Sequence, residues 1–244
     1  MNIRMYNIDS ISRLMRQSID VQESNPEVIT TFSHKIGCPP TWQFHDVFGT
    51  DPELLAMVPT PVVAVLFLFP LTPEIEQFAT DSVEKIKKEG QSVPESLWFC
   101  KQKIGNACGT MAVLHALLNC QESMEIEGWA KRLYEKTKTK SPDDRADELN
   151  EDTELESLHQ SAAEEGQTQP QMDDVDSHFL CIVHKDGSMY ELDGRKPFPI
   201  NLGKSSPSSL LQDAVGSIKE RIFDREPGQV NFSIMALGPA LPLD

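Results

Sequence analysis

The sequence lacks any apolar run that could cross a membrane. Its longest uncharged apolar stretch, residues 61–71, is too short to span a bilayer and indicates a buried strand instead. It also lacks an internal repeat, and hydrophobic residues make up 39% and charged residues 25% of its 244 positions. This length and balance predict one large globular domain with a sizeable core, which does not associate with membranes.

Cysteine is scarce, and its spacing fits no motif. The five cysteines are odd in number and scattered, and no two have the CxxC spacing of a metal or redox site. The sequence therefore predicts neither a disulfide framework nor a zinc site. This cysteine usage fits a reducing compartment best, so we expect the protein in the cytoplasm and also in the nucleus.

Positive charge is in short supply, since 22 Lys and Arg stand against 38 Asp and Glu, for a net charge of −16. Much of the excess lies between Asp143 and Asp176, where thirteen acidic residues accompany one arginine. A surface of this charge repels nucleic acid and anionic lipid, and it attracts basic partners or basic tails. A solvated loop that its charge keeps soluble explains the cluster equally well.

Residues 1–22 read as an N-terminal extension whose structure the pattern leaves open. Apolar residues recur there at helical spacing with arginines between them, as in an amphipathic helix. A mitochondrial presequence shares this pattern, but Asp9 and Asp20 count against one. We expect a terminal extension, or a helix packed on the single domain that residues 23–244 form.

Helices and strands alternate along this domain without a βαβ rhythm. Capping residues, prolines and helical periodicity predict helices over 26–36, from Pro52, and over 73–89, 109–119, 128–139, 142–158 and 207–223. Apolar runs predict strands near Phe44 and over 61–69, 179–184, 188–192 and 230–237. Residues 160–177 read as an irregular loop. The order predicts an α+β domain with a central, mostly antiparallel sheet flanked by helical lobes.

One short loop carries the clearest chemistry. It delivers Cys108 to the first turn of the buried helix, where free backbone N–H groups and the helix dipole favour a thiolate. The same N–H groups can hold the oxyanion that forms when a thiolate attacks a carbonyl, and Gln102 could add an amide donor. A small apolar cysteine packed at the start of a helix explains the position equally well.

A thiol nucleophile benefits from a histidine oriented by a carboxylate. Among six histidines, His115 shares the helix of Cys108 but lies about 10 Å further along its axis. His178 is better placed, because a hairpin turning at Asp186-Gly187 makes it a diagonal neighbour of Asp193. A polar residue at a strand end and an aspartate that forms a turn are the alternative interpretations of this pair.

These residues match a known family. Residues 102–117, residues 178–200 with their Tyr-Glu-Leu-Asp-Gly-Arg-Lys-Pro-Phe-Pro run, and residues 51–55 resemble the ubiquitin carboxyl-terminal hydrolase family of cysteine proteases. The similarity is closest to the small members that consist of the catalytic domain alone, and it covers residues 23–237. Two spacings make it specific: a glutamine six residues before the cysteine, and an aspartate fifteen residues after the histidine.

The resemblance assigns roles to the site residues. It implies that Cys108 is the nucleophile, His178 the general base, Asp193 its orienting partner and Gln102 an oxyanion donor. It also implies a papain-like fold with a knotted backbone, an exception to the usual rule for chain topology. A crossover loop at the active site is implied at residues 156–176.

The resemblance also implies substrate and partner. Glu23, Glu27 and Asp46 match acidic positions that contact the basic C-terminal tail of ubiquitin. The implied activity is hydrolysis of small adducts or short extensions from the C-terminal glycine of ubiquitin, or of a ubiquitin-like protein, through an acyl-enzyme intermediate. No metal or cofactor is implied, and we expect a monomer.

Two other classes of protein remain as alternatives. A catalytically silent ubiquitin-binding module could keep the fold and the acidic surface, but it would be expected to lose the Cys, His or Gln that this chain retains. A different papain-like protease or acyltransferase also has Cys and then His in chain order. The aspartate on the same hairpin as the histidine argues against that class.

Overall fold

The computed structural model describes residues 25–103, 107–155, 157–158, 177–228 and 230–241. The predicted extension at 1–22 and Glu23 lie outside these ranges. So does nearly all of the predicted crossover loop at 156–176, and both segments stay predictions of the sequence. None of the described helices is long and apolar enough to cross a membrane.

A six-stranded sheet forms the centre of the molecule, in the order β1-β6-β2-β3-β4-β5, and every neighbouring pair is antiparallel. The strands are β1 (Trp42–Asp46), β2 (Ala64–Pro70), β3 (Ser177–Lys185), β4 (Ser188–Leu192), β5 (Ile200–Lys204) and β6 (Ser233–Pro239). The predicted antiparallel sheet is therefore confirmed. The apolar run predicted as a buried strand becomes β2, which lies inside the sheet between β6 and β3.

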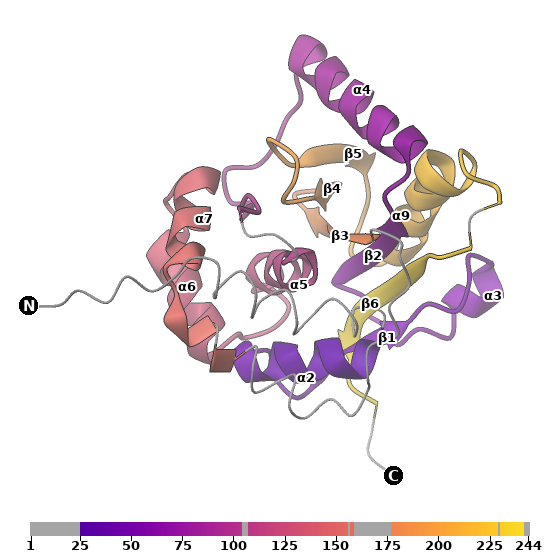
Figure 1. The fold of residues 1–244 in the computed structure, drawn as a ribbon. Helices are drawn as coiled ribbons and strands as arrows, with labels where there is room; N and C mark the ends of the chain where they lie inside the picture. The colour runs from indigo at the N-terminus through magenta and orange to yellow at the C-terminus, as the bar shows by residue number, and fades with distance from the viewer. Residues whose placement is uncertain (1–24, 104–106, 156, 159–176, 229, 242–244) are drawn as a thin grey trace, which may run out of the picture.

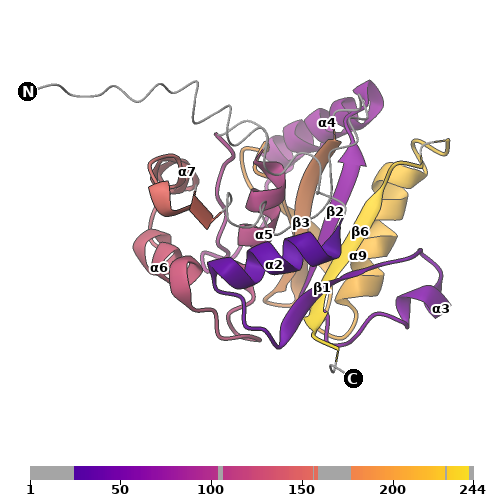
Figure 2. The same ribbon diagram turned by 60° about the horizontal axis from the view of Figure 1, so that its bottom comes forward.

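Helices cover both faces of this sheet (Figures 1 and 2). One face carries α2 (Pro26–Ile36), α5 (Cys108–Asn119), α6 (Gly128–Thr137) and α7 (Pro142–Asn150). The other carries α3 (Pro52–Leu55), α9 (Leu210–Ile218) and the π-helix η1 (Lys219–Phe223), with the start of α4 (Pro73–Glu89). Each face has its own cluster of buried apolar residues, so the sheet separates two cores.

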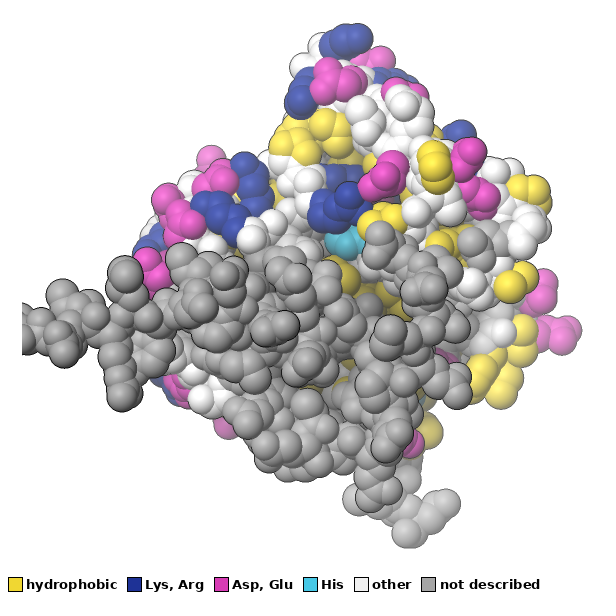
Figure 3. All heavy atoms as spheres, viewed as in Figure 1, with side chains coloured by type: hydrophobic (Ala, Val, Ile, Leu, Met, Phe, Trp, Pro, Cys, Tyr) yellow, Lys and Arg dark blue, Asp and Glu magenta, His cyan; other side chains and the backbone are white. Residues whose placement is uncertain are grey.

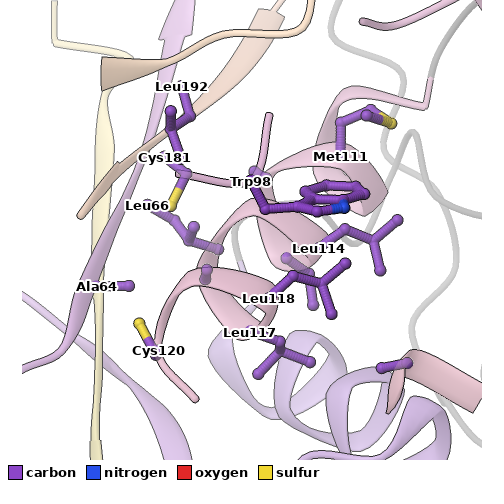
Figure 4. Packing of buried hydrophobic residues seen from close by; sticks show 14 of the residues in the cluster. Ala64, Leu66, Trp98, Met111, Leu114, Leu117, Leu118, Cys120, Cys181 and Leu192 are labelled. Carbon is purple, nitrogen blue, oxygen red and sulfur yellow. The ribbon is translucent and has the colours of Figure 1, made fainter. Parts of the chain in front are cut away.

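Helix α5 is the centre of the larger core. All twelve of its residues are buried, as its apolar sequence predicts for a helix surrounded by other elements. Figure 4 shows Leu114, Leu117 and Leu118 of this helix with Trp98, and Leu66, Cys181 and Leu192 of the sheet beside them. A core of this kind fixes both ends of α5, including the end that carries Cys108.

The ends of α2 follow the sequence signals. The Asn25 side chain accepts a hydrogen bond from the Glu27 N–H at 2.9 Å, Pro26 occupies the first turn, and Gly37 ends the helix with φ of 126°. A Cβ atom at Gly37 would lie 2.0 Å from the Glu127 carbonyl oxygen, so no other residue fits there. Glycine is required at this position by both its backbone angle and its contact.

The structure differs from the sequence prediction in several elements. The helix predicted over 142–158 ends at Asn150, and a new helical turn starts at Thr153, capped by the Asp152 carboxylate. The helix predicted over 207–223 is shorter and ends in a π-helical turn, and β6 starts at Ser233. Strand β5 was not predicted, because its sequence Ile-Asn-Leu-Gly-Lys contains only two apolar residues.

We predict that Leu114→Ala lowers the free energy of unfolding by about 2–5 kcal/mol, because it leaves a cavity in the fully buried centre of α5. Urea denaturation followed by circular dichroism measures this loss. Val230→Ala is the control, since the Val230 side chain is 84% exposed and its truncation should leave the unfolding midpoint unchanged. Equal midpoints for wild type and Leu114→Ala would contradict the buried position of this helix.

Candidate active site

The hairpin of β3 and β4 brings His178 and Asp193 together. Asp186 and Gly187 form its two-residue turn, both with positive φ (48° and 78°), the backbone that matches the twist of the strands. Cys181 pairs with Leu192, which is the register that the sequence predicts. Successive side chains on a strand point to opposite faces, so His178 and Asp193 project from the same face of the sheet.

A short hydrogen bond joins the two side chains. The His178 Nε2 atom lies 2.7 Å from the Asp193 Oδ1 atom, and both residues are buried, with 3% and 5% of their surface exposed. An ionised carboxylate only accepts hydrogen bonds, so Nε2 carries the proton and donates it. The Phe69 ring packs against the imidazole at 5.7 Å in an edge-on arrangement. The second ring nitrogen, Nδ1, is then the atom that can take up a proton.

The surroundings of Asp193 keep it ionised. Burial acts to raise the pKa of its carboxyl group, but the hydrogen bond and the charge of His178, the charge of Lys196 and the Arg195 N–H together lower the pKa to about 2. The Arg195 N–H donates to Oδ1 at 2.9 Å, and the Lys196 ammonium lies 4.0 Å from Oδ2. A permanently charged carboxylate favours a histidine that must become a cation during a reaction.

Helix α5 begins at Cys108, one residue before the predicted start, and this places Cys108 in its first turn as the sequence predicts. It runs alongside β3 in the same direction, because Glu122, just beyond its C-terminal end, pairs with Lys185 at the end of the strand. Cys108 lies about 17 Å up the helix from Asn119, and His178 lies about 23 Å up the strand from Lys185. These similar lengths bring the first turn of α5 to the end of the sheet where β3 begins.

His115 links α5 to the same region. Its Nε2 atom lies 3.2 Å from the Cys100 carbonyl oxygen, so this fully buried histidine is bonded to backbone in the core. Burial lowers its pKa to about 4, against the opposing effects of the Cys100 backbone and the Asp193 carboxylate. His115 therefore stays neutral near neutral pH and lies close enough to Asp193 to feel its charge.

Gln102 approaches this end of the sheet from a third segment. Its N–H donates to the Gly194 carbonyl at 2.8 Å, directly after Asp193. A Cβ atom at Gly194 would lie 2.9 Å from the Gln102 Cβ, so this glycine permits the close approach of the two backbones. The structure thus joins Gln102, Asp193 and His178 through consecutive contacts at the end of the sheet where α5 starts.

The other four cysteines are poor candidates for a nucleophile. All five cysteines lie in the described part of the chain, all are buried, and none is in a disulfide. Burial raises the pKa of Cys38 to about 11 and the pKa values of Cys100 and Cys120 to about 12, and it raises the pKa of Cys181 well above the usual value for a thiol. These four thiols stay protonated at neutral pH. Cys108 differs from them by its position at a helix N-terminus.

Two of the three predicted substrate-contacting acids lie in the described part of the chain. Helix α2 runs antiparallel to β1, since His34 bonds the Trp42 carbonyl and Thr30 bonds the Phe44 N–H. The exposed Glu27 therefore lies at the same end as the half-buried Asp46, whose pKa is raised by burial. Glu23 lies outside the described residues.

The strand pairing relates these acids to the histidine. Asp46 pairs with Met235, Met235 with Leu66, and Leu66 with Cys181, three residues from His178. Strand spacings of about 4.8 Å and rises of about 3.3 Å put Asp46 about 17 Å from His178, towards the same end of the sheet. Both described acids thus share that end with the histidine–aspartate pair.

Sequence reasoning missed a group of charges beneath Asp193. Glu191 is 3% exposed and pairs with Lys196 and with Arg221, at 2.5 Å in the case of Arg221. The sequence contains a signal for this group, because Glu191 in β4 and Asp193 just after it are two residues apart and so share a face. A cavity of about 410 Å³ between α4, the sheet and α9 is lined by both acids and by His178.

Figure 3 shows the face of the molecule where a histidine side chain lies beneath a group of lysine and arginine side chains, with acidic side chains nearby. Among the described residues, no group of three or more His, Cys, Asp or Glu side chains is arranged to hold a metal ion.

We predict that Asp193→Asn destabilises the fold in a pH-dependent way. The folded pKa of Asp193, about 2, lies below the value of about 3.9 for an unfolded chain, so its charge stabilises the fold fully above pH 4. That contribution disappears as the pH falls towards 2. The difference in unfolding free energy between wild type and Asp193→Asn should therefore shrink over this range.

Urea unfolding of the two proteins at a series of pH values measures this difference. The control is Asp186→Asn in the exposed turn of the same hairpin, where asparagine suits the backbone equally well. A gap between wild type and Asp193→Asn that stays constant from pH 6 to pH 2 would contradict a buried, ionised Asp193.

Comparison with known proteins agrees with this arrangement. The sequence profile of "Ubiquitin carboxyl-terminal hydrolase, family 1" matches residues 21–223. A probable ubiquitin carboxyl-terminal hydrolase of Dictyostelium discoideum is 42% identical over 219 residues, which cover 88% of this chain and 86% of the relative. Ubiquitin carboxyl-terminal hydrolase isozyme L1 of Rattus norvegicus is 42% identical over 217 residues, 88% of this chain and 96% of that protein.

A solved structure shows the same fold. The Trichinella spiralis UCH37 catalytic domain bound to ubiquitin vinyl methyl ester superposes with a TM-score of 0.71 at 24% identity, over 89% of this chain and 94% of the other. The predicted papain-like α+β fold is thereby confirmed, while its knot stays a prediction. With the profile match and the close relatives, the chain belongs to the ubiquitin carboxyl-terminal hydrolase family.

Proposed function

We propose that this protein is a deubiquitinating thiol hydrolase that cleaves the bond after the C-terminal glycine of ubiquitin. Family membership supports the reaction class. The observation that carries the proposal is the buried His178–Asp193 hydrogen bond of 2.7 Å, at the end of the sheet where α5 begins with Cys108. A nucleophile, a base and a group that orients the base are the parts that acyl transfer requires.

In the proposed reaction, His178 Nδ1 takes the proton of the Cys108 thiol, and the thiolate attacks the glycine carbonyl. When the tetrahedral intermediate collapses, the imidazolium returns the proton to the leaving amine, and a thioester to Cys108 remains. The imidazole then takes a proton from water, the hydroxide attacks the thioester, and the proton passes to the departing Cys108 sulfur. Asp193 holds the imidazole in one orientation and stabilises its cation throughout.

Oxyanion stabilisation is assigned to two donors. The backbone N–H of Cys108 is at the N-terminus of α5, the positive end of the helix dipole, which favours a negative charge nearby. The Gln102 side-chain amide is the second donor, supported by the contact of Gln102 with Gly194. Neither donor needs to move far during the reaction, because the backbone of each is tied to the core or to the hairpin.

Recognition of ubiquitin is proposed to use the acidic residues at the same end of the sheet. An extended peptide spans about 3.3 Å per residue, so the distance of about 17 Å from His178 to Asp46 equals five to six residues of an extended tail. Glu27 lies at that end too, and Glu23 precedes it in the chain. The net charge of −16 favours encounter with a basic tail.

Substrate size follows from the family resemblance. We propose that small adducts and short extensions of ubiquitin, or of a ubiquitin-like protein, are cleaved faster than folded conjugates. Comparing the release of a small ester or amide with that of a folded C-terminal fusion tests this. Equal rates for the two substrates would contradict a size limit.

The alternative hypothesis is a catalytically silent ubiquitin-binding module, and a measurement of catalysis distinguishes it from a hydrolase. We predict that Cys108→Ala and His178→Ala abolish release of a fluorophore from the C-terminus of ubiquitin. Gln102→Ala should lower kcat/KM by about 10²–10³-fold, the usual loss for one oxyanion donor. Ubiquitin binding, measured by calorimetry, should persist in Cys108→Ala.

A covalent probe with a reactive group at the ubiquitin C-terminus adds a direct check. It should label wild type and leave Cys108→Ala unlabelled, and a tail peptide without the ubiquitin body should label neither. A wild-type protein that binds ubiquitin but neither turns over nor reacts would overturn the hydrolase in favour of the binding module. Labelling by the tail peptide alone would favour a less selective thiol protease.

The cellular setting is part of the proposal. The reaction needs a reduced Cys108, and the absence of disulfides among all five cysteines fits the cytoplasm and nucleus. We also propose that the protein acts as a monomer, because every group assigned a role comes from one chain.

A further inference from the structure

Arg145, on α7, is a buried cation with an unusual set of partners. Only 6% of its surface is exposed, and none of the ion pairs formed by the described residues includes it. Its guanidinium instead donates to three backbone carbonyls, those of Thr137 (3.0 Å), Phe99 (2.8 Å) and Lys138 (2.9 Å), and lies 5.3 Å from the Trp98 ring. Burying a charge without a counter-charge is costly, so these carbonyls must be well placed.

Two of the three bonds have a plain structural purpose. Thr137 and Lys138 end α6, and the last carbonyls of a helix need donors from outside and favour a positive charge nearby. The third bond is different, because Phe99 belongs to the extended segment 98–103 that leads to Gln102. This bond connects α7 to the chain that carries the proposed oxyanion donor.

The extended segment 98–103 is held from two sides in strict alternation. Its even-numbered residues bond to the side of α5 and the hairpin: Trp98 to Asn119, Cys100 to His115, and the Gln102 N–H to Gly194. Its odd-numbered residues bond to α7: the Phe99 carbonyl to Arg145, and the Lys101 N–H to the Pro142 carbonyl at 3.2 Å. Backbone groups of successive residues in an extended chain point to opposite sides, which makes this double attachment possible.

Ion pairs on the surface also connect the extended segment 98–103 to α7. Lys101 pairs with Asp143 and Lys103 with Asp147, each at 2.6 Å, so the residues on both sides of Gln102 are tied to the same helix. These pairs are half-exposed and contribute little each. The buried guanidinium is the attachment that salt and solvent do not weaken.

We propose that Arg145 is a positioning residue for the hydrolysis. It holds the extended segment 98–103 in the position from which the Gln102 side-chain amide can donate a hydrogen bond to the oxyanion. This inference rests on the proposed function of Gln102. Arg145 touches neither substrate nor reacting atoms, and it acts only through Gln102. Without the bond to Phe99, the segment keeps its attachments to α5 and the hairpin and the Lys101–Pro142 bond to α7, but it loses the attachment to the buried guanidinium.

The test is a double-mutant cycle with Arg145→Lys and Gln102→Ala. Lysine keeps the buried charge but lacks the planar fork that reaches three carbonyls at once. We expect Arg145→Lys to lower kcat for the ubiquitin fluorophore substrate about tenfold, because small misplacements of a catalytic group are costly. KM should stay within about twofold of wild type, since the loss lies in the transition state. In the Gln102→Ala background, Arg145→Lys should leave kcat unchanged.

Trp129→Phe is the matched control. Trp129 on α6 donates to Asp152, just after α7, at 3.0 Å, so its replacement loosens the same pair of helices without touching the extended segment 98–103. Its effect on kcat should be small and equal in both backgrounds. Arg145→Lys lowering kcat by the same factor with and without Gln102, or lowering only the unfolding temperature, would overturn the inference.

A second variant serves if Arg145→Lys does not fold. Arg145→Gln removes the three-way guanidinium attachment and, being neutral, leaves no unpaired charge in the core, so the fold should tolerate it better than lysine. A loss of kcat that vanishes with Gln102→Ala supports the inference, and an unchanged kcat contradicts it. If wild type fails to turn over, or if Cys108→Ala keeps its activity, the proposed function itself is wrong, which separates the two failures.

Discussion

The site depends on one buried hydrogen bond, between His178 Nε2 and Asp193 Oδ1. It joins residues fifteen positions apart, and it forms because a turn of two residues with left-handed backbone fixes the register of β3 and β4. The bond in turn fixes which imidazole nitrogen is left for chemistry. The aspartate is kept charged by Lys196 and by the Arg195 N–H, and Lys196 is itself held by the buried Glu191.

The second requirement is a rigid frame that delivers two further groups to the same end of the sheet. Helix α5 is buried along its whole length, so its first residue has little freedom. The extended segment 98–103 lies between α5 and α7 and has backbone bonds on both sides, which places Gln102 beside Gly194. Large buried elements, and not the loops that join them, thus determine where the site residues lie.

Much of this arrangement could be predicted from the sequence. Caps and prolines gave the starts of α2, α4 and α7, and the Asp186-Gly187 turn gave the register that pairs His178 with Asp193. Other features depend on tertiary contacts, which produce no periodic pattern in the sequence. Strand β5 has few apolar residues and pairs with β4 despite this, and Asp152 ends one helical stretch by capping the next. The burial of Arg145 could not be predicted from the sequence, because an arginine in an amphipathic helix usually points to solvent.

The geometry of the hairpin also limits how this stretch of chain can change over evolution. Removing or adding one residue in β3 or β4 would turn either the imidazole or the carboxylate to the opposite face of the sheet and so separate the pair. Length changes are therefore compatible with the pair only when they come in twos, one in each strand, or when a bulge absorbs them. The spacing of fifteen residues between this histidine and this aspartate thus reflects the alternation of side chains along two paired strands, whatever the identity of the residues in between.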